Sequence, residues 1–154
     1  MSAAVDALNL APSARAAALE LLAKHPGVVF TSGRRDAEAQ ALAMAGNVAL
    51  NRRWIAATYR ATAERDQLQA WVDAHPEATT RDAVAAGLLL IMETWGDAQR
   101  ARLSRHIAGL AFDVQPVAGA TGEAIKATIR GLPGLVKFLE REGGLVRWHA
   151  EFAP

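Results

Sequence analysis

The alternation of hydrophobic and polar residues predicts helices through the first two thirds of the chain. Apolar residues recur at helical spacing from Pro12 to Lys24, and the turn at residues 25–27 ends this helix. A second helical pattern runs from Asp36 to about Tyr59. Its apolar stripe consists of Ala41, Met44, Val48, Leu50 and Ile55.

Two more helices are predicted before residue 100. One covers Asp66 to Ala74, and the other covers Asp82 to Trp95 with Thr79 or Thr80 as its N-terminal cap. The longest apolar run, Ala83 to Met92, is half the roughly 20 residues that a membrane-spanning helix needs. We therefore expect a buried helix there and no stable insertion into a membrane.

Short strands are predicted at three places. Val28 to Thr31 and Ala111 to Val114 are rich in β-branched and aromatic residues, and Leu145 to Phe152 alternates strictly between apolar and polar residues. Short helices are predicted from Glu123 to Arg130 and from Leu135 to Glu142, the latter ended by two glycines. The pattern is typical of a helix-rich α+β fold, with residues 1–154 forming a single domain and a small antiparallel sheet.

Composition narrows the class of protein. A chain of 154 residues with 51% hydrophobic content can bury a core, and a net charge of +1 does not favour nucleic acid as a partner. Because the chain has no cysteine, any metal must be held by histidine and carboxylate groups. The N-terminal residues lack the pattern of a secretory signal, which predicts a protein that is cytoplasmic at synthesis.

The four histidines provide the candidate chemistry. His25 and His75 precede prolines at predicted helix ends, where an imidazole usually has a structural role. His106 lies seven residues before Asp113, a carboxylate in an apolar strand, and His149 lies on the polar face of the last strand. Two imidazoles and one carboxylate form a common catalytic zinc set. A buried His–Asp hydrogen bond and a non-haem iron site are the alternatives.

Three blocks of sequence resemble a known family of zinc peptidases. The stretch SRHIAGLAFDV resembles the motif SxHxxGxAxD of peptidase family M15, which includes D-alanyl-D-alanine carboxypeptidases and dipeptidases and the L-alanyl-D-glutamate endopeptidases of phage endolysins. TSGRRD at residues 31–36, with Gln40 behind it, resembles the block SGYRSxxxQ, and RWHAEF at 147–152 resembles the terminal zinc block. The blocks span residues 31–152.

The resemblance implies roles for individual residues and a hedgehog-like fold whose sheet carries the zinc site. It makes His106, Asp113 and His149 the zinc ligands. Arg35 matches the arginine that faces the substrate and stabilises negative charge, Gln40 matches the glutamine behind it, and Ser104 matches the serine of the central motif. We expect Gln40 and Ser104 to bind the substrate, and Ser104 also to form local hydrogen bonds.

Two positions depart from the family pattern. Val146 stands where the catalytic carboxylate is expected, three residues before the last histidine, and Arg34 replaces the tyrosine of the first block. A general base must then come from elsewhere. Glu151, on the same strand face as His149, is the first candidate, and Glu142, before the two glycines, is the second.

The predicted function is hydrolysis of peptide bonds in bacterial peptidoglycan by a zinc-dependent peptidase, most simply a phage lysis enzyme. We expect a monomer that depends on a holin for release and then acts on the cell wall. Arg147, and also Arg34, Arg52 and Arg53, could bind the carboxylates of stem peptides. The alternative is a zinc-stabilised wall-binding or structural protein without catalytic activity.

Overall fold

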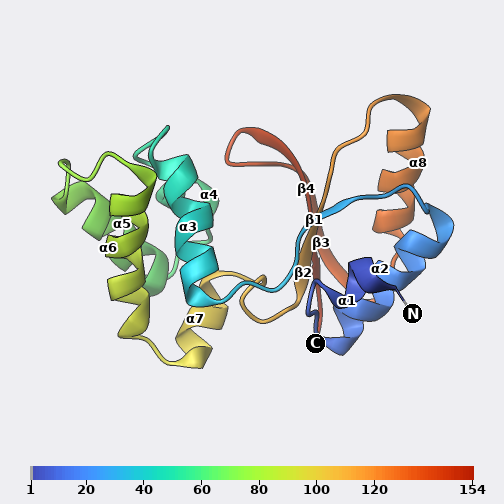
Figure 1. Ribbon diagram of the computed structural model, residues 1–154, viewed down its shortest axis with the longest axis horizontal. Coiled ribbons are helices and arrows are strands. Elements are labelled where there is room, and N and C mark those ends of the chain that lie inside the picture. The colour runs from blue at the N-terminus through green and yellow to red at the C-terminus, as the bar shows by residue number, and fades with distance from the viewer. Residues whose placement is uncertain (1) are drawn as a thin grey trace. The chain divides into compact units, whose positions relative to one another are not determined.

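The computed structural model describes residues 2–154, which form eight α-helices and four β-strands (Figure 1). The chain divides into two compact units, and each has its own hydrophobic core. Unit 1 contains the residues up to Arg34 together with Ala108–Pro154, and unit 2 contains Arg35–Ile107. The helix-rich α+β fold class is confirmed, while the assignment of residues 1–154 to a single domain stays a prediction.

The small predicted sheet is present in unit 1 and is antiparallel throughout. Its strands lie in the order β1-β2-β4-β3, so β2 and β4 are central. The strands are β1 (Phe30–Ser32), β2 (Ala111–Val114), β3 (Leu135–Glu142) and β4 (Leu145–Phe152).

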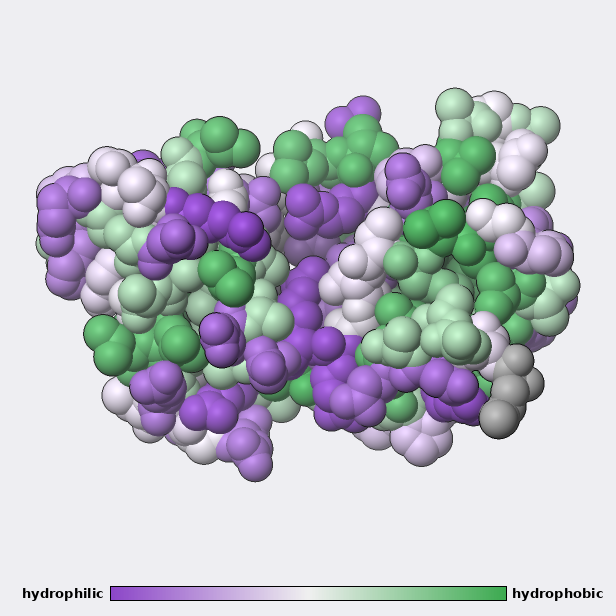
Figure 2. Space-filling view, in the orientation of Figure 1, coloured by the Kyte–Doolittle hydropathy of each residue, from purple (hydrophilic) through white to green (hydrophobic). Residues whose placement is uncertain are grey.

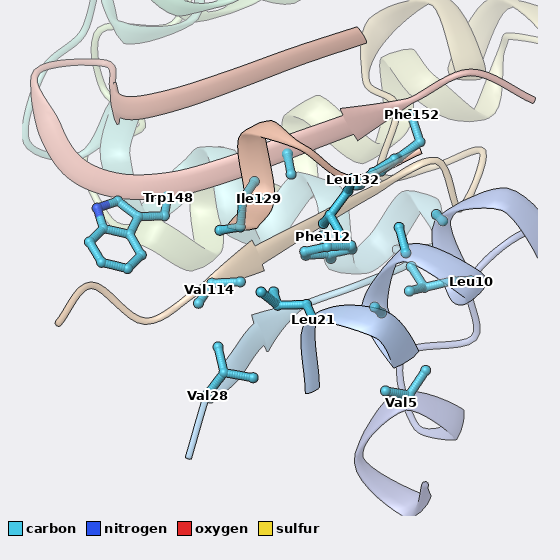
Figure 3. Packing of buried hydrophobic residues seen from close by; sticks show 14 of the residues in the cluster. Val5, Leu10, Leu21, Val28, Phe112, Val114, Ile129, Leu132, Trp148 and Phe152 are labelled. Atoms are coloured by element: carbon cyan, nitrogen blue, oxygen red, sulfur yellow. The ribbon is translucent and has the colours of Figure 1, made fainter. Parts of the chain in front are cut away.

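One face of this sheet forms the core of unit 1 (Figure 3). Phe112 of β2 stacks on Phe152 of β4, with 5.1 Å between ring centroids. Trp148 lies four residues before Phe152 on the same face of β4. The helices of the unit are α1 (Ala3–Asp6), α2 (Pro12–Lys24) and α8 (Gly119–Arg130), and residues of all three belong to this core.

Unit 2 is entirely helical among its described elements. Its helices are α3 (Ala37–Val48), α4 (Trp54–Thr58), α5 (Ala63–Ala74), α6 (Arg81–Glu93) and α7 (Asp97–Leu103). Met44, Leu68 and Leu88 are fully buried and belong to one core cluster. The predicted cap of α6 is confirmed, because the Thr80 hydroxyl accepts a hydrogen bond from Ala83 N–H.

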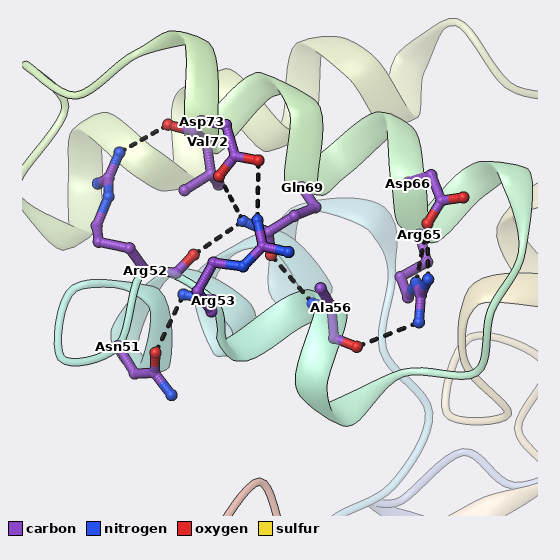
Figure 4. Close-up of polar contacts among 9 residues, drawn as sticks. All are labelled: Asn51, Arg52, Arg53, Ala56, Arg65, Asp66, Gln69, Val72 and Asp73. Atoms are coloured by element: carbon purple, nitrogen blue, oxygen red, sulfur yellow. Dashed lines mark hydrogen bonds and ion pairs between the residues drawn. The ribbon is translucent and has the colours of Figure 1, made fainter.

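The prediction of one helix from Asp36 to Tyr59 was wrong, because the helix is interrupted between the end of α3 and the start of α4. The Gln69 side chain donates to the carbonyl of Arg52 within the break and accepts from Ala56 N–H in α4 (Figure 4). Leu50, placed on the predicted apolar stripe, is 86% exposed at the break. Tertiary hydrogen bonds thus override helical periodicity here.

The prediction of a helix from Leu135 to Glu142 was also wrong, because this segment is strand β3. It pairs with β4 across the tight turn at Gly143 and Gly144, whose φ angles are 59° and 81°. Two consecutive residues with positive φ form the turn that suits a two-residue hairpin, and glycine adopts it without strain. The two glycines therefore connect paired strands.

Two short helices, α1 and α7, were not predicted from the sequence. Among residues 2–154, none of the helices combines the length and apolar character needed to cross a membrane. Figure 2 shows hydrophilic and hydrophobic side chains interspersed on the face that it presents.

Candidate metal centre

The pairing of β2 with β4 places polar side chains on the sheet face opposite the core. Asp113 pairs with His149, and Ala111 pairs with Glu151. Because successive strand residues point to opposite faces and Trp148 and Ala150 belong to the core, His149 and Glu151 lie on the other face. Asp113 shares that face as the direct partner of His149.

The structure brings the three predicted ligands together. His106, Asp113 and His149 are only 3%, 3% and 5% exposed. Each offers one ligand atom, and these atoms lie within 4.8 Å of one another. Burying polar side chains costs free energy unless they form hydrogen bonds or bind a metal ion. This group could hold a metal ion.

The two ring nitrogens of His149 face different carboxylates. Nδ1 lies 2.8 Å from Oδ1 of Asp113 and 3.7 Å from Oε2 of Glu142. Nε2 lies 3.0 Å from Oε1 of Glu151, on the far side of the ring. An ion held by both Asp113 and His149 would therefore bind Nδ1, which leaves Nε2–H to donate to Glu151.

Glu142 reaches His149 from the neighbouring strand β3. Between the pairs Leu139–His149 and Arg141–Val146, β3 has one residue and β4 has two. The extra residue therefore belongs to β4, which forms a bulge there. Glu142 lies beyond the bulge, where it pairs with Leu145, and its Oε2 lies 3.7 Å from Nδ1 of His149.

Negative charge is concentrated around His149. Burial by itself lowers the pKa of this imidazole, but hydrogen bonds to Asp113 and Glu151, with the charges of Asp113 and Glu142, outweigh burial. They raise the pKa from its ordinary 6.5 to about 9. Three carboxylates around one imidazole favour a positive charge at this position, carried by a proton or by a metal ion.

The donor set is one that divalent metal ions accept. Two imidazole nitrogens and one carboxylate oxygen match a three-ligand zinc site, and the same set also occurs in non-haem iron proteins. Glu151 supplies the outer carboxylate that metal-bound histidines usually contact through their second nitrogen. The residues present fit a metal centre of this kind.

The loop that carries His106 is fixed by hydrogen bonds within unit 2. The Ser104 hydroxyl accepts a hydrogen bond from His106 N–H at 3.2 Å. Arg35 N–H donates to the carbonyl of His106 at 3.0 Å, which brings two of the sequence motifs together. In the structure Ser104 thus supports the loop of His106, while its predicted contact with substrate stays a prediction.

Arg35 belongs to a short chain of side-chain hydrogen bonds in unit 2. Its Nη1 donates to Oε1 of Gln40 at 3.3 Å, and Nε2 of Gln40 donates to the Tyr59 hydroxyl at 2.9 Å. Gln40 is fully buried, and the Tyr59 ring packs edge-on against Trp54. Tyr59 could not be identified from the sequence, because nothing in the local pattern relates it to Gln40, 19 residues earlier.

Three of the four arginines considered for carboxylate binding have structural partners. The Arg52 guanidinium donates to the carbonyls of Val72, His75 and Ala78, where α5 ends. Arg53 pairs with Asp73 at 2.9 Å (Figure 4). Arg34 donates through Nε to the carbonyl of Asn9.

The glycine of the central motif is required by its surroundings. Gly109 has a φ of 74°, and a Cβ atom there would lie 2.5 Å from Nη2 of Arg34. Its carbonyl accepts a hydrogen bond from Ala11 N–H. Arg34 and Gly109 thus both form hydrogen bonds with the N-terminal segment, Arg34 with Asn9 and Gly109 with Ala11.

The remaining histidines have the structural role expected from the sequence. Nε2 of His25 lies 2.8 Å from the Thr128 hydroxyl, and Nδ1 of His75 lies 2.7 Å from the carbonyl of Trp71. Neither belongs to the metal-binding group found among residues 2–154.

Comparison of the chain with protein-family models, with curated proteins and with solved structures finds no match. The class that the fold and the site define is an α+β protein with a buried His–Asp–His group that could hold a metal ion.

Proposed function

We propose that this protein is a zinc-dependent peptidase that hydrolyses peptide bonds in bacterial peptidoglycan. The observation that carries the proposal is the buried group of His106, Asp113 and His149, with Glu142 near the nitrogen of His149 that faces Asp113. A structural zinc site is usually closed by four protein ligands, whereas three ligands with a nearby carboxylate leave room for water. The resemblance of the three sequence blocks supplies the substrate class.

The two glutamates receive different roles in this proposal. Glu142 Oε2 takes the proton from the attacking water and delivers it to the leaving amine. Glu151 Oε1 accepts the hydrogen bond of Nε2–H and holds the His149 ring in orientation. The contacts of His149 thus favour Glu142, the second candidate of the sequence analysis, over Glu151 as the general base.

Arg35 stabilises the negative charge that develops on the substrate carbonyl oxygen. Its guanidinium is held by Gln40, and its backbone is bonded to His106, so its position is tied to a metal ligand. Zinc, when bound, acts as a Lewis acid that makes water a nucleophile near neutral pH.

Turnover of purified peptidoglycan tests the proposal. Protein loaded with one equivalent of zinc should cleave peptide bonds of peptidoglycan, which exposes new amino groups. A chelator should abolish this cleavage. The variant His106→Ala should lose both zinc retention and turnover, because two ligands remain and Asp113 stays buried without a compensating cation. Full activity in chelator-treated protein would contradict the proposal.

A zinc-stabilised binding or structural protein is the second candidate. The observation in its favour is Val146, which stands at the position of the family carboxylate and is 55% exposed. This alternative predicts that zinc raises the unfolding temperature while zinc-loaded protein binds peptidoglycan without cleaving it. Sedimentation with purified peptidoglycan, measured beside amine release, separates the two functions.

A role in phage lysis is the biological setting that we propose for this activity. The support for this setting is the resemblance of the three sequence blocks to those of M15 peptidases, which include phage endolysins. Access to the wall would then depend on release from the cytoplasm, for example by a holin.

A further inference from the structure

The bulge in β4 lies directly before His149 in the chain. Arg147 and Trp148 of β4 stand opposite the single residue Glu140 of β3. A bulge leaves one residue without a partner and interrupts the hydrogen bonds between the strands. Backbone pairing alone therefore fixes β3, which carries Glu142, less firmly beside His149 than it would in a regular hairpin.

The side chain of Lys126 in α8 contacts both strands at the bulge. Its Nζ lies 2.7 Å from Oε1 of Glu140 on β3 and 5.6 Å from the ring centroid of Trp148 on β4. An ammonium within about 6 Å of an indole centroid is attracted by the negative face of the ring. One cation thus connects the two strands where their pairing is irregular.

Lys126 is itself fixed by its surroundings. Its side chain is only 13% exposed, and a second carboxylate, that of Glu123, lies 2.9 Å from Nζ. Hydrogen bonds to Glu140 and Glu123 raise the pKa of Lys126 above its ordinary value of 10.5, so the ammonium stays charged at neutral pH. Because the ammonium is largely withdrawn from water, its contacts are screened less than those of an exposed ion pair.

Gly122 brings α8 close to the same part of β4. It lies one turn before Lys126, and residues four apart share a helix face. A Cβ atom at Gly122 would lie 3.3 Å from Cη2 of Trp148 and 1.7 Å from the carbonyl oxygen of Val117. The helix thus packs against the buried Trp148 ring at two consecutive turns.

We propose that Lys126 is a positioning residue that sets the place of Glu142 relative to His149. It does so by connecting β3 with β4 at the bulge. This inference rests on the proposed function, in which Glu142 is the proton acceptor. Asp113 and His149 pair across β2 and β4 without a shift in register, so the position of these two ligands does not depend on Lys126. Lys126 acts on the approach of β3.

Lys126→Met tests this inference, because it removes the charge and keeps an unbranched apolar side chain beside Trp148. In zinc-loaded protein, kcat should fall by about 10- to 100-fold, the cost of displacing a reacting group by about 1 Å, while KM and zinc content stay nearly unchanged. In the Glu142→Gln background the same substitution should cost little further turnover, because Lys126 acts through Glu142. Lys126→Arg should restore most of the rate, since a guanidinium also binds a carboxylate and stacks on an indole ring.

Amide hydrogen exchange provides a second readout that does not depend on activity. In metal-free Lys126→Met, exchange should become several-fold faster in residues 139–147 and stay unchanged in β2, because only the pairing of β3 with β4 loses a contact. Lys24→Met is the matched control, since Lys24 pairs with Glu20 within α2 of the same unit. The control should change neither exchange in the hairpin nor kcat. A uniform increase of exchange throughout Lys126→Met would show a general loss of stability and would contradict a positioning role.

The outcomes separate this inference from the proposed function. Locally faster exchange in a protein that cleaves no peptidoglycan supports the positioning role and contradicts the peptidase proposal. Cleavage by Lys126→Met at the wild-type rate, with unchanged exchange, contradicts the positioning role alone. An equal loss of kcat with and without the carboxylate of Glu142 contradicts it as well. If Lys126→Met does not fold, Glu140→Gln removes the same ion pair from its more exposed side and should give the same local change in exchange.

Discussion

Glu142 lies 3.7 Å from Nδ1 of His149, and replacing it tests the proposed proton transfer at the scale of one residue. Glu142→Gln keeps the size and the hydrogen-bonding capacity of the side chain but cannot take up a proton. We expect turnover to fall by about 10²- to 10⁴-fold, the usual contribution of general acid–base catalysis. Zinc content, measured by metal analysis, should stay near one per chain because Glu142 is not among the three ligands.

Glu151→Gln is the matched change on the other side of the same imidazole. We expect weaker zinc retention, by about 10- to 100-fold, because the carboxylate that orients His149 is lost. At saturating zinc most of the turnover should return. If Glu151→Gln instead abolished turnover with zinc fully retained, and Glu142→Gln were harmless, the two roles would have to be exchanged.

Tyr59→Phe tests the support of Arg35. It removes the hydroxyl that accepts from Gln40 and keeps the ring that packs on Trp54. We expect kcat to fall by less than the roughly 10²- to 10³-fold predicted for Arg35→Ala, with KM and zinc content nearly unchanged. In the double variant the two losses should not add, because both act through Arg35. Additive losses would show that Tyr59 acts independently.

The ligands could be predicted from the sequence because His106, Asp113 and His149 stand in blocks with fixed spacing. The different contacts of the two glutamates could not be predicted, because the approach of Glu142 to His149 depends on the pairing of β3 with β4 and on the bulge in β4. Tyr59 could not be predicted either, since its contact with Gln40 depends on the break between α3 and α4.

At the scale of elements, the β3–β4 hairpin positions Glu142 and His149, and substitutions in its turn test this role. Gly144 has a φ of 81°, and nothing lies within 4 Å of a Cβ atom added there. Gly144→Ala should lower the free energy of unfolding by about 1–2 kcal/mol, because a residue with a Cβ atom is strained in this conformation.

Gly27→Ala provides the comparison for the turn. A Cβ atom at Gly27 also meets nothing within 4 Å, and its φ is not in the positive region that strains other residues. Its effect in urea unfolding should stay within about 0.5 kcal/mol. Equal effects of the two substitutions would contradict the assignment of the strain to the hairpin turn.

The sequence pattern was sufficient to predict the elements whose structure depends mainly on their own residues. The bounds of α2 and β4 agree with those predicted, because helical spacing and strict alternation are local signals. β3 was assigned wrongly, because leucine, lysine and glutamate are good helix formers and only pairing with β4 makes the segment a strand. The two glycines between them were the available signal for a hairpin.

At the scale of the whole molecule, metal-free and zinc-loaded protein should respond to pH in opposite directions. In metal-free protein the pKa of His149 is raised to about 9, so protonated His149 stabilises the fold fully below pH 6.5. This stability, a few kcal/mol at most, should be lost as the pH rises through 9. Zinc requires the neutral imidazole, so zinc binding should strengthen over the same range.

Unfolding in urea between pH 6 and 9.5, with and without zinc, measures both trends. His149→Gln should flatten the pH dependence of the metal-free protein, since the titrating imidazole is gone. A metal-free protein that becomes more stable as the pH rises would contradict the charge arrangement around His149.

The central claim is that a metal ion held by His106, Asp113 and His149 serves peptide hydrolysis. Its most direct test is the rate of amine release from purified peptidoglycan as zinc is added back to metal-free protein. We predict that the rate rises in proportion to bound zinc and reaches its maximum at one equivalent per chain. Stoichiometric zinc binding with no amine release at any loading would contradict the claim.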